Sequence, residues 1–481
     1  MKTGNAYQKI VLSLKRRGKG ATAADICAAT ALPLNEVQEL LPKAADEYQG
    51  RLQVTQSGEI LYTFPNGFTS RYRGFQAMIN RFAQKGASVL KTALAFLFKA
   101  WIMVMLIGYF VLFLALAVAS VLISVAARSS SDDRRGGFGG FNLFGLLWRI
   151  WFFNELTRPR YGYGPVTRKT GEKRPMHKAI FSFVFGEDDP NRDWEERESK
   201  AVIEYIQANR GVISLAEYMA FSGKNSVDAE EAILSFCSRY GGSPEVTEEG
   251  TIVYRFDDLL LRADSKNFGE LSPPIKRLKT FSVNPKKLNG WFIAINAVNL
   301  LFGSYFLYNS FASGLLVTEM QYQSASYFYA FTHYLLSTIS ADPLGIIRGA
   351  LGFVPLVFSL LFWIIPAVRR FLETKANEDI KLSNFKRLGF SKIWAKPVKV
   401  ELSDLAQSCE ECSPKNITAA ADRVIKDMGA VSSPEIENGE DGKTFYSFRE
   451  LVNEKQALQK YREGIDPART QLGETVFDSS E

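Results

Sequence analysis

One short pattern occurs three times in the sequence: Gly58-Glu-Ile-Leu-Tyr62-Thr-Phe64, Gly250-Thr-Ile-Val-Tyr254-Arg-Phe256 and Gly442-Lys-Thr-Phe-Tyr446-Ser-Phe448. In each copy a turn glycine is followed by alternating apolar and aromatic residues, which is typical of the returning strand of a β-hairpin with one buried face. Recurrence at such long intervals indicates duplicated domains rather than the short repeats of a solenoid. The sequence therefore predicts three copies of one small module.

The residues ahead of each hairpin predict the helices of the module. In the second copy we expect three helices, over 195–209, from the N-cap Ser214, and over 227–240. The first copy has the same order, with helices over 7–17, from Thr22, and over 34–48. In the third copy Ser403 caps the second helix, the third helix covers 414–428, and the first lies somewhere within 377–394. Three helices followed by a hairpin resemble a winged-helix domain, and this resemblance implies a mainly α fold with small β-wings.

Long apolar stretches separate the predicted modules. A transmembrane helix needs about 20 apolar residues, and three stretches meet that length, namely 100–127, 290–312 and 349–367. A fourth stretch, 141–156, has an apolar part of only 13 residues that includes Arg149, so we expect an interfacial or short membrane helix there. The fold class is therefore three winged-helix-like domains interleaved with transmembrane helices.

These elements divide the chain into eleven segments. The winged-helix-like domains are 1–70, 181–265 and 368–463, and the transmembrane helices are 100–127, 290–312 and 349–367. The connecting segments are a basic juxtamembrane helix at 71–99, a Gly/Arg-rich linker at 128–180, a basic linker at 266–289, an aromatic extracytoplasmic loop at 313–348 and a flexible tail at 464–481. Just after the Gly/Arg-rich linker, Phe181–Phe185 has the composition of a strand and precedes a run of acidic residues.

Positive charge lies beside the apolar stretches. The chain has a formal net charge of +7, and its membrane-flanking basic residues include Lys276, Arg277, Lys279, Lys286, Lys287, Arg369 and Arg370. Such residues favour the cytoplasmic flank of a membrane helix and are attracted to anionic headgroups. We therefore expect the lipid bilayer as a partner and the second and third modules on the cytoplasmic or stromal side. The side of the first module stays open.

Many winged helices place their third helix in the DNA major groove, so nucleic acid is the rival explanation for basicity. The third helix of the first copy has four acidic residues and one basic residue, and that of the second copy has three acidic residues and one basic residue. Acidic helices repel phosphate, so nucleic acid is not the expected partner. The third copy alone is a candidate, through Lys415, Arg423 and Lys426.

The pair Cys409-Glu-Glu-Cys412 is the one metal-like motif. Two thiols are half of a zinc or iron–sulfur site, and no second pair or nearby histidine in the sequence completes it. Cys409 matches the position of Cys27 in the first module, which indicates an apolar packing position. The chain has only two histidines and four cysteines, so we expect a reducing compartment, no bound cofactor and no enzymatic activity.

Winged helices around membrane spans, together with Phe183-Val-Phe-Gly-Glu-Asp-Asp-Pro-Asn191, resemble a poorly characterised family of bacterial and chloroplast membrane proteins sometimes labelled iron–sulfur-cluster related. The resemblance implies a bacterial inner membrane or a plastid membrane, and its label implies a use for Cys409 and Cys412. It supplies no catalytic residue. We predict a multi-pass membrane scaffold or assembly factor that binds unidentified proteins, with a homo-oligomer left open. The alternatives are a membrane-tethered DNA-binding regulator and an iron–sulfur or redox-related protein.

Overall fold

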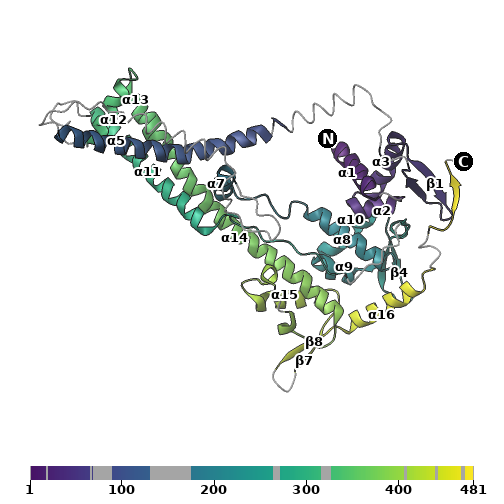
Figure 1. Ribbon diagram of the computed structural model, residues 1–481. Coiled ribbons are helices and arrows are strands. Elements are labelled where there is room, and N and C mark those ends of the chain that lie inside the picture. The colour runs from purple at the N-terminus through teal and green to yellow at the C-terminus, as the bar shows by residue number, and fades with distance from the viewer. Residues whose placement is uncertain are drawn as a thin grey trace. The chain divides into compact units, whose positions relative to one another are not determined.

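The computed structural model describes residues 2–17, 20–65, 68, 89–90, 92–129, 175–263, 271–315, 327–405, 409–438, 443–466 and 472–479 (Figure 1). The chain folds into two compact units, and each is described by itself. The sheet unit comprises Met1–Arg81, Asp189–Lys279 and Ala376–Glu481, and the apolar unit comprises Phe82–Asp188 and Thr280–Lys375. The interfacial helix predicted at 141–156 lies outside the described residues.

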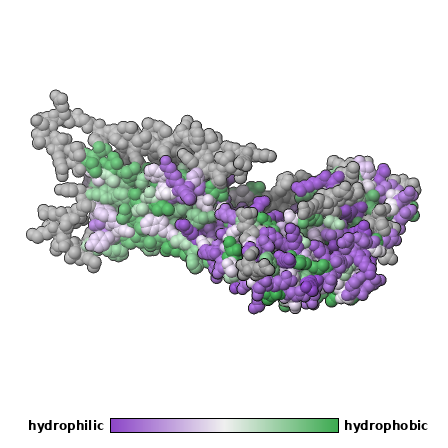
Figure 2. Space-filling view, turned by 90° about the horizontal axis from the view of Figure 1, so that it is seen from below, coloured by the Kyte–Doolittle hydropathy of each residue, from purple (hydrophilic) through white to green (hydrophobic). Residues whose placement is uncertain are grey.

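The apolar unit is built from helices. They are a π-helical segment η1 (Val104–Gly108), α5 (Tyr109–Ser129), α7 (Met176–Phe185), α11 (Lys286–Leu315), α12 (Tyr327–Ser337), α13 (Pro343–Ile346), a second π-helical segment η3 (Ile347–Phe353) and the first part of α14 (Val354–Ala395). Three helical stretches are long and apolar enough to cross a membrane: Thr92–Ile123, Lys286–Ala312 and Pro343–Ala395. Figure 2 shows hydrophobic residues over much of the visible surface of this part of the molecule.

Two buried asparagines join the long helices of the apolar unit. Asn296 Nδ2 of α11 donates to the carbonyl oxygen of Ser359 in α14 at 2.9 Å, and Asn299 Nδ2 donates to that of Leu106 in η1 at 2.7 Å. Both side chains are fully buried. Asparagine side chains that bond across helices hold membrane helices together, so the two residues connect α11 to both of its long neighbours.

The sheet unit contains three small antiparallel sheets. Strands β1 (Arg51–Thr55), β2 (Ile60–Thr63) and β9 (Thr475–Asp478) pair in the order β2-β1-β9. The second sheet has the order β3-β5-β4, with β3 (Val212–Ser214), β4 (Ser243–Val246) and β5 (Ile252–Arg255). The third has the order β6-β8-β7, with β6 (Val400–Glu401), β7 (Glu435–Asn438) and β8 (Thr444–Ser447).

The three recurring tyrosines occupy similar places in these sheets. Tyr254 pairs with Ile213 and Tyr446 pairs with Val400, and in both cases the tyrosine belongs to the central strand. Tyr62 forms an isolated bridge with Ala21, the residue just before the N-cap of the helix that follows. Each tyrosine therefore ties the hairpin to the chain ahead of a short helical segment.

Four of the described helices of the sheet unit begin at polar side-chain caps, namely Thr22, Ser214, Asn225 and Asn416. The described helices of this unit are α1 (Lys2–Arg17), α2 (Ala23–Thr30), α3 (Leu34–Glu47), α8 (Trp194–Ala208), α9 (Leu215–Ser222), α10 (Ser226–Tyr240), the end of α14, α15 (Ile417–Gly429) and α16 (Arg449–Glu463), with short 3₁₀ turns η2 (Asp257–Leu259), η4 (Leu402–Leu405) and η5 (Glu410–Cys412). Thr22 with Asp25 and Ser214 with Glu217 form capping boxes, in which each side chain bonds to the other residue's backbone N–H. These boxes fix where α2 and α9 start.

One continuous hydrophobic core connects all three parts of the sheet unit. It includes Ile10 from α1, Ile233 from α10 and Phe390 from α14, all fully buried. At one junction the hydroxyl of Tyr240 donates to the carbonyl oxygen of Ala31 at 2.9 Å. Truncating one buried aliphatic or aromatic side chain typically lowers the free energy of unfolding by about 2–5 kcal/mol. Because each of the three parts contributes such side chains to the shared core, the three parts stabilise one another.

One prediction of local structure was wrong. Phe181–Phe185 is not a strand but the end of α7, which terminates at Gly186, where φ is +86°. Arg369 donates to the carbonyl oxygens of Ser182 and Phe183, so it satisfies groups that the last turn of a helix leaves free.

The boundary predicted at residue 368 falls inside α14, a single helix over Val354–Ala395 that continues through Pro366, and the two units also divide within this helix, between Lys375 and Ala376. One predicted segment does need correction. The tail after Gly464 is not entirely loose, because β9 pairs with β1 near the other end of the chain. Helix α16, which precedes that tail, was not predicted as an element of its own.

Candidate functional site

Cys409 and Cys412 lie at the two ends of the η5 turn. The N–H of Cys412 donates to the carbonyl oxygen of Cys409 at 3.1 Å, and the Cys409 thiol lies 3.4 Å from an Oε2 of Glu411. Cys412 is fully buried and Cys409 is half-buried, so the packing residue is Cys412 and not Cys409 as predicted. Burial, then the neighbouring Cys409 thiol and Glu411, raise the pKa of Cys412 to about 12.

A metal site needs further ligands around this pair. Among the described residues, no group of three or more His, Cys, Asp or Glu side chains gathers as a metal site. The structure thus brings the two thiols together on one turn, and within the described part of the chain it adds no third ligand.

The three residues predicted to contact DNA lie on or just before α15. Lys415, Arg423 and Lys426 all have exposed side chains. The exposed Asp422 lies on the same helix, and Asp427 forms a 2.6 Å ion pair with Lys386. The exposed surface of α15 therefore has mixed charge and is not a continuous cationic face.

The seven basic residues predicted to flank the membrane have different surroundings. Arg277, Lys286, Lys287 and Arg370 are exposed. Lys279 pairs with Asp189 at 2.9 Å, and the Lys276 ammonium lies 5.2 Å from the centroid of the Trp194 ring. Arg369 donates to three backbone carbonyls, including that of Phe281 at 2.8 Å. Lys276, Lys279 and Arg369 therefore have internal contacts that the sequence did not indicate.

An extended segment, residues 271–280, is held by two asparagines of α14. Asn384 accepts from the N–H of Lys276 and donates to its carbonyl oxygen, both at 2.8 Å. Asn377 makes the same pair of bonds with Lys279, again at 2.8 Å. Asn384 also donates to the carbonyl oxygen of Glu411 at 2.9 Å. We call Asn377 and Asn384 the asparagine clamp.

The spacing of the asparagine clamp follows from helix geometry and from the repeat of its partner. Seven residues of an α-helix span about 10.5 Å and return to nearly the same face. Residues three apart in a β-strand face opposite sides, whereas in a chain of threefold repeat such as polyproline II they face the same side and lie about 9 Å apart. Asn377 and Asn384 can therefore meet Lys279 and Lys276 in register when the bound segment repeats every three residues.

Arg387 fixes the same region from the next turn of α14. Its guanidinium donates to the carbonyl oxygen of Ser222 at 2.9 Å and to that of Pro274 at 2.6 Å, and it pairs with Glu198. The guanidinium carbon lies 4.6 Å from the centroid of the Trp194 ring. Only 2% of Arg387 is exposed, so this cation is buried among its partners.

A cavity of about 520 Å³ lies beside the asparagine clamp. Its charged lining residues are of both signs: Asp189, Arg192, Glu195, Lys276, Lys279 and Asp379. Burial, then the charge of Arg387, lowers the pKa of Lys276. The cavity therefore offers acidic and basic groups and one lysine whose proton is held less strongly than usual, and none of the described residues in its wall is a histidine or cysteine.

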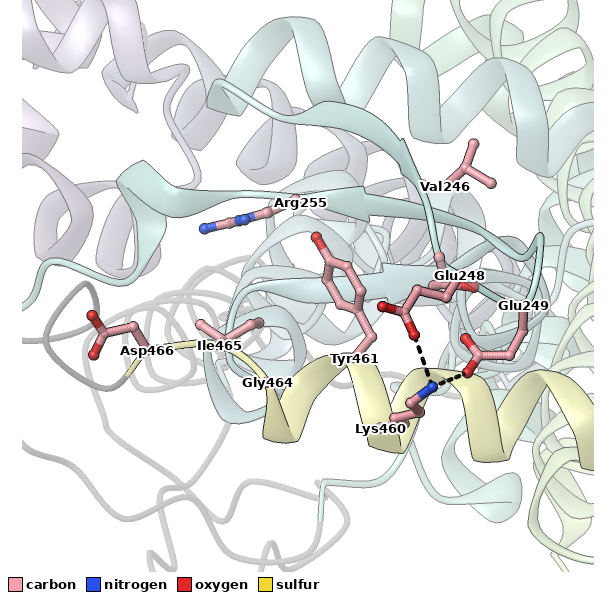
Figure 3. A pocket seen from close by; sticks show the side chains of 10 residues that line it. Val246, Glu248, Glu249, Arg255, Lys460, Tyr461, Gly464, Ile465 and Asp466 are labelled. Atoms are coloured by element: carbon pink, nitrogen blue, oxygen red, sulfur yellow. Dashed lines mark hydrogen bonds and ion pairs between the residues drawn. The ribbon is translucent and has the colours of Figure 1, made fainter.

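A second cavity, of about 630 Å³, lies between α16 and the β4–β5 hairpin (Figure 3). Lys460 bridges Glu248 and Glu249 at 2.9 and 2.8 Å, and the Tyr461 hydroxyl donates to Glu245. Arg255 pairs with Asp257 at 2.7 Å. The contacts of Lys460 and Tyr461 attach α16 to the hairpin. Together with the Arg255–Asp257 pair, they give each of these three cavity-lining side chains a partner within the protein.

An exposed surface on α10 and the adjoining β4–β5 hairpin is both apolar and acidic. Val227 and Leu234 of α10 are 74% and 48% exposed, and the cross-strand pair Val246 and Ile252 is 66% and 55% exposed. The exposed charged residues around Val227 and Leu234 on α10 are mainly acidic, namely Asp228, Glu230 and Glu231. We call these seven residues the α10 face.

The acidic character of α10 is predictable from the sequence, whereas the asparagine clamp and Arg387 were not predicted. Asparagines spaced by seven on one helix are a usable signal, because they share a face. The segment 271–280 gives no matching signal, because the two asparagines bind its backbone and not its side chains.

The chain is similar to a plant protein. An uncharacterised chloroplastic protein of Arabidopsis thaliana is 26% identical over 438 residues, which cover 85% of this chain and 76% of the relative. No protein-family model matches the chain. No solved structure matches it either.

Proposed function

We propose that this chain is a multi-pass membrane scaffold or assembly factor that binds other proteins through winged-helix modules at the membrane surface. The observation that carries the proposal is the α10 face, where exposed apolar side chains lie among carboxylates on the helix that a DNA-binding winged helix would use. Apolar patches with a polar rim are typical of protein-binding surfaces. Carboxylates in this place oppose binding to phosphate.

The arrangement of elements supports the assignment of winged-helix modules. The helices α8, α9 and α10 are followed by the β4–β5 hairpin, and β3 pairs with β5 to complete the small sheet. The helices α1, α2 and α3 precede the β1–β2 hairpin in the same order. In the third module, the end of α14 takes the place of the first helix, and α15 that of the third.

The membrane assignment rests on three apolar helical stretches and on charge. Apolar side chains of these stretches, such as Leu114, Leu301 and Phe353, are about half exposed or more, as expected for residues that face lipid. Exposed Lys286, Lys287 and Arg370 support a cytoplasmic or stromal side for the neighbouring modules. The chloroplastic relative supports a plastid membrane or the inner membrane of a bacterium.

Site-specific photo-crosslinking in native membranes tests the proposal. A photoreactive amino acid replaces Leu234 in the full-length chain, and the matched control carries it at Leu12, an exposed leucine on α1. We expect a discrete protein adduct at Leu234 that is absent at Leu12 and decreases in a D228K/E231K background. Equal, diffuse labelling at both positions would count against the α10 face as a binding surface.

The alternative of a DNA-binding regulator makes the opposite prediction. It requires salt-dependent binding of the detergent-solubilised chain to duplex DNA, and loss of that binding in an R423E/K426E variant. Absence of binding at low salt would remove this alternative, and binding that these substitutions weaken would replace the scaffold proposal.

A further inference from the structure

The Cys409–Cys412 turn already has the backbone geometry of a disulfide loop. The 3.1 Å bond from the Cys412 N–H to the Cys409 carbonyl closes an i to i+3 turn, and residues 410–412 are 3₁₀-helical. Cys409 itself is extended, with φ −89° and ψ 130°, and an i to i+3 turn keeps its first and last Cα atoms within about 7 Å. The two thiols lie within hydrogen-bonding reach of each other. Disulfides span Cα distances of about 4.4–6.8 Å. The bond can therefore form without moving the backbone.

Two side chains of α14 hold the turn in place. Asn384 of the asparagine clamp donates to the carbonyl oxygen of Glu411, in the middle of the turn, at 2.9 Å. The N–H of Lys415, just after the turn, donates to a carboxylate oxygen of Glu378 at 3.1 Å. Both anchoring side chains belong to α14. The two thiols are thus held next to each other on a rigid base.

The two thiols differ in accessibility. Cys409 is half-buried and can meet another protein, whereas Cys412 is fully buried beneath it. The other two cysteines, Cys27 and Cys237, are buried on two separate helices, α2 and α10. An accessible thiol next to a buried one is the arrangement of a pair in which the first sulfur reacts with a partner and the second resolves the intermediate.

We propose that Cys409 and Cys412 form a reversible disulfide by exchange with a protein of the dithiol–disulfide class. Oxidation begins when the Cys409 thiol loses its proton and its sulfur attacks the partner disulfide. A mixed disulfide forms, and the released partner thiolate takes up a proton. Cys412 then loses its proton and attacks the sulfur of Cys409, and the second partner thiolate leaves and is protonated. Two cysteine thiols are oxidised and one partner disulfide is reduced to two thiols.

Thiol counting on the full-length chain in detergent tests this proposal. The protein is equilibrated either with an excess of reduced dithiothreitol or with an excess of oxidised protein disulfide isomerase, an oxidant of the proposed class with a relatively high reduction potential. Each sample is quenched with acid, denatured and alkylated with a maleimide-linked polymer. We expect all four cysteines to react after reduction and only two after oxidation, and a peptide map to show Cys409 joined to Cys412. The C27S/C237S variant should still lose two thiols on oxidation, because these residues take no part.

The variant C409S separates the proposal from its alternatives. It removes the more exposed thiol, so folding is little affected, and its three remaining cysteines should react equally after reduction and oxidation. Loss of thiols in C409S, or four reactive thiols in the oxidised wild type, would overturn the proposal. A near-stoichiometric zinc or iron content in the purified wild type that C409S lacks would also overturn it, in favour of a metal site. The α10 face plays no part in these readouts, so their outcome is independent of the scaffold function.

Discussion

Replacing Arg387 should destabilise the sheet unit more than any surface substitution. Arg387→Ala removes the donors to the carbonyl oxygens of Ser222 and Pro274 and leaves Glu198 without this partner. It also removes the cation that lies over Trp194. Arg387 is 2% exposed, so water replaces these contacts poorly.

The magnitude follows from these contacts. Breaking a buried ion pair by deleting one partner costs about 3–5 kcal/mol. The Glu198 side chain is 20% exposed, so in the variant water hydrates it in part and reduces this cost. The carbonyl groups of Ser222 and Pro274 lose hydrogen bonds from a charged donor, and each such bond contributes about 1.5–3 kcal/mol to stability. We therefore expect a loss of about 3–5 kcal/mol. The sheet unit has about 280 residues and hence an unfolding entropy of about 0.6 kcal/mol/K, so its Tm should fall by at least about 5 °C.

Thermal unfolding of the full-length chain in detergent, followed by tryptophan fluorescence, measures this change. The matched control is Arg423→Ala, an exposed arginine of α15, which should change stability by less than about 0.5 kcal/mol. Arg387→Lys keeps the charge but loses the planar fork, and its Tm should lie between those of the wild type and Arg387→Ala. Equal Tm values for the two alanine variants would refute the buried-cation reasoning.

Three further predictions concern single side chains. Asn384→Asp keeps an acceptor for the Lys276 N–H but loses the N–H groups that donate to the carbonyls of Lys276 and Glu411. It should lower the free energy of unfolding by about 3 kcal/mol, against about 2 kcal/mol for Asn384→Ala, and both variants should speed amide hydrogen exchange at Lys276. Equal exchange rates in the wild type and the variants would contradict the clamp. Burial, together with the charge of Glu217, raises the pKa of Glu454. A carboxyl whose pKa is raised on folding costs stability above that pKa, and the cost disappears as the pH falls to the ordinary glutamate pKa of 4.5. Glu454→Gln should therefore be more stable than the wild type at pH 8, and its gain in Tm should shrink as the pH falls towards 4.5. Asn299→Leu should lower resistance to denaturation in SDS by about 0.6–2 kcal/mol relative to Leu301→Ala, a lipid-exposed control.

Local rules predicted the elements that depend on neighbouring residues. Thr22 and Ser214 start helices because each lies three residues before a carboxylate that completes a capping box. Tyr254 and Tyr446 lie in strands because β-branched and aromatic residues alternate after a turn glycine. These signals act over a few residues, so a single sequence contains them.

The wrong predictions all involve contacts between distant residues. Phe181–Phe185 is aromatic enough for a strand, but Arg369 and Gly186 end it as a helix, and Arg369 lies more than 180 residues away. Nothing near β9 in the sequence identifies β1 as its neighbour.

The asparagine clamp shows why part of the candidate site leaves little trace in the sequence. Asn377 and Asn384 bind the backbone of the segment 271–280, so these bonds set no requirement on the side chains there, although Lys276 and Lys279 make separate contacts with Trp194 and Asp189. The same helix carries Arg387, which binds two carbonyl groups, and presents Asn384 to the Cys409–Cys412 turn. One face of α14 thus organises the extended segment, the end of α9 and the thiol pair through backbone contacts. A change on that face should affect all three at once, whereas a side-chain change in the bound segment should leave the asparagine bonds to its backbone in place.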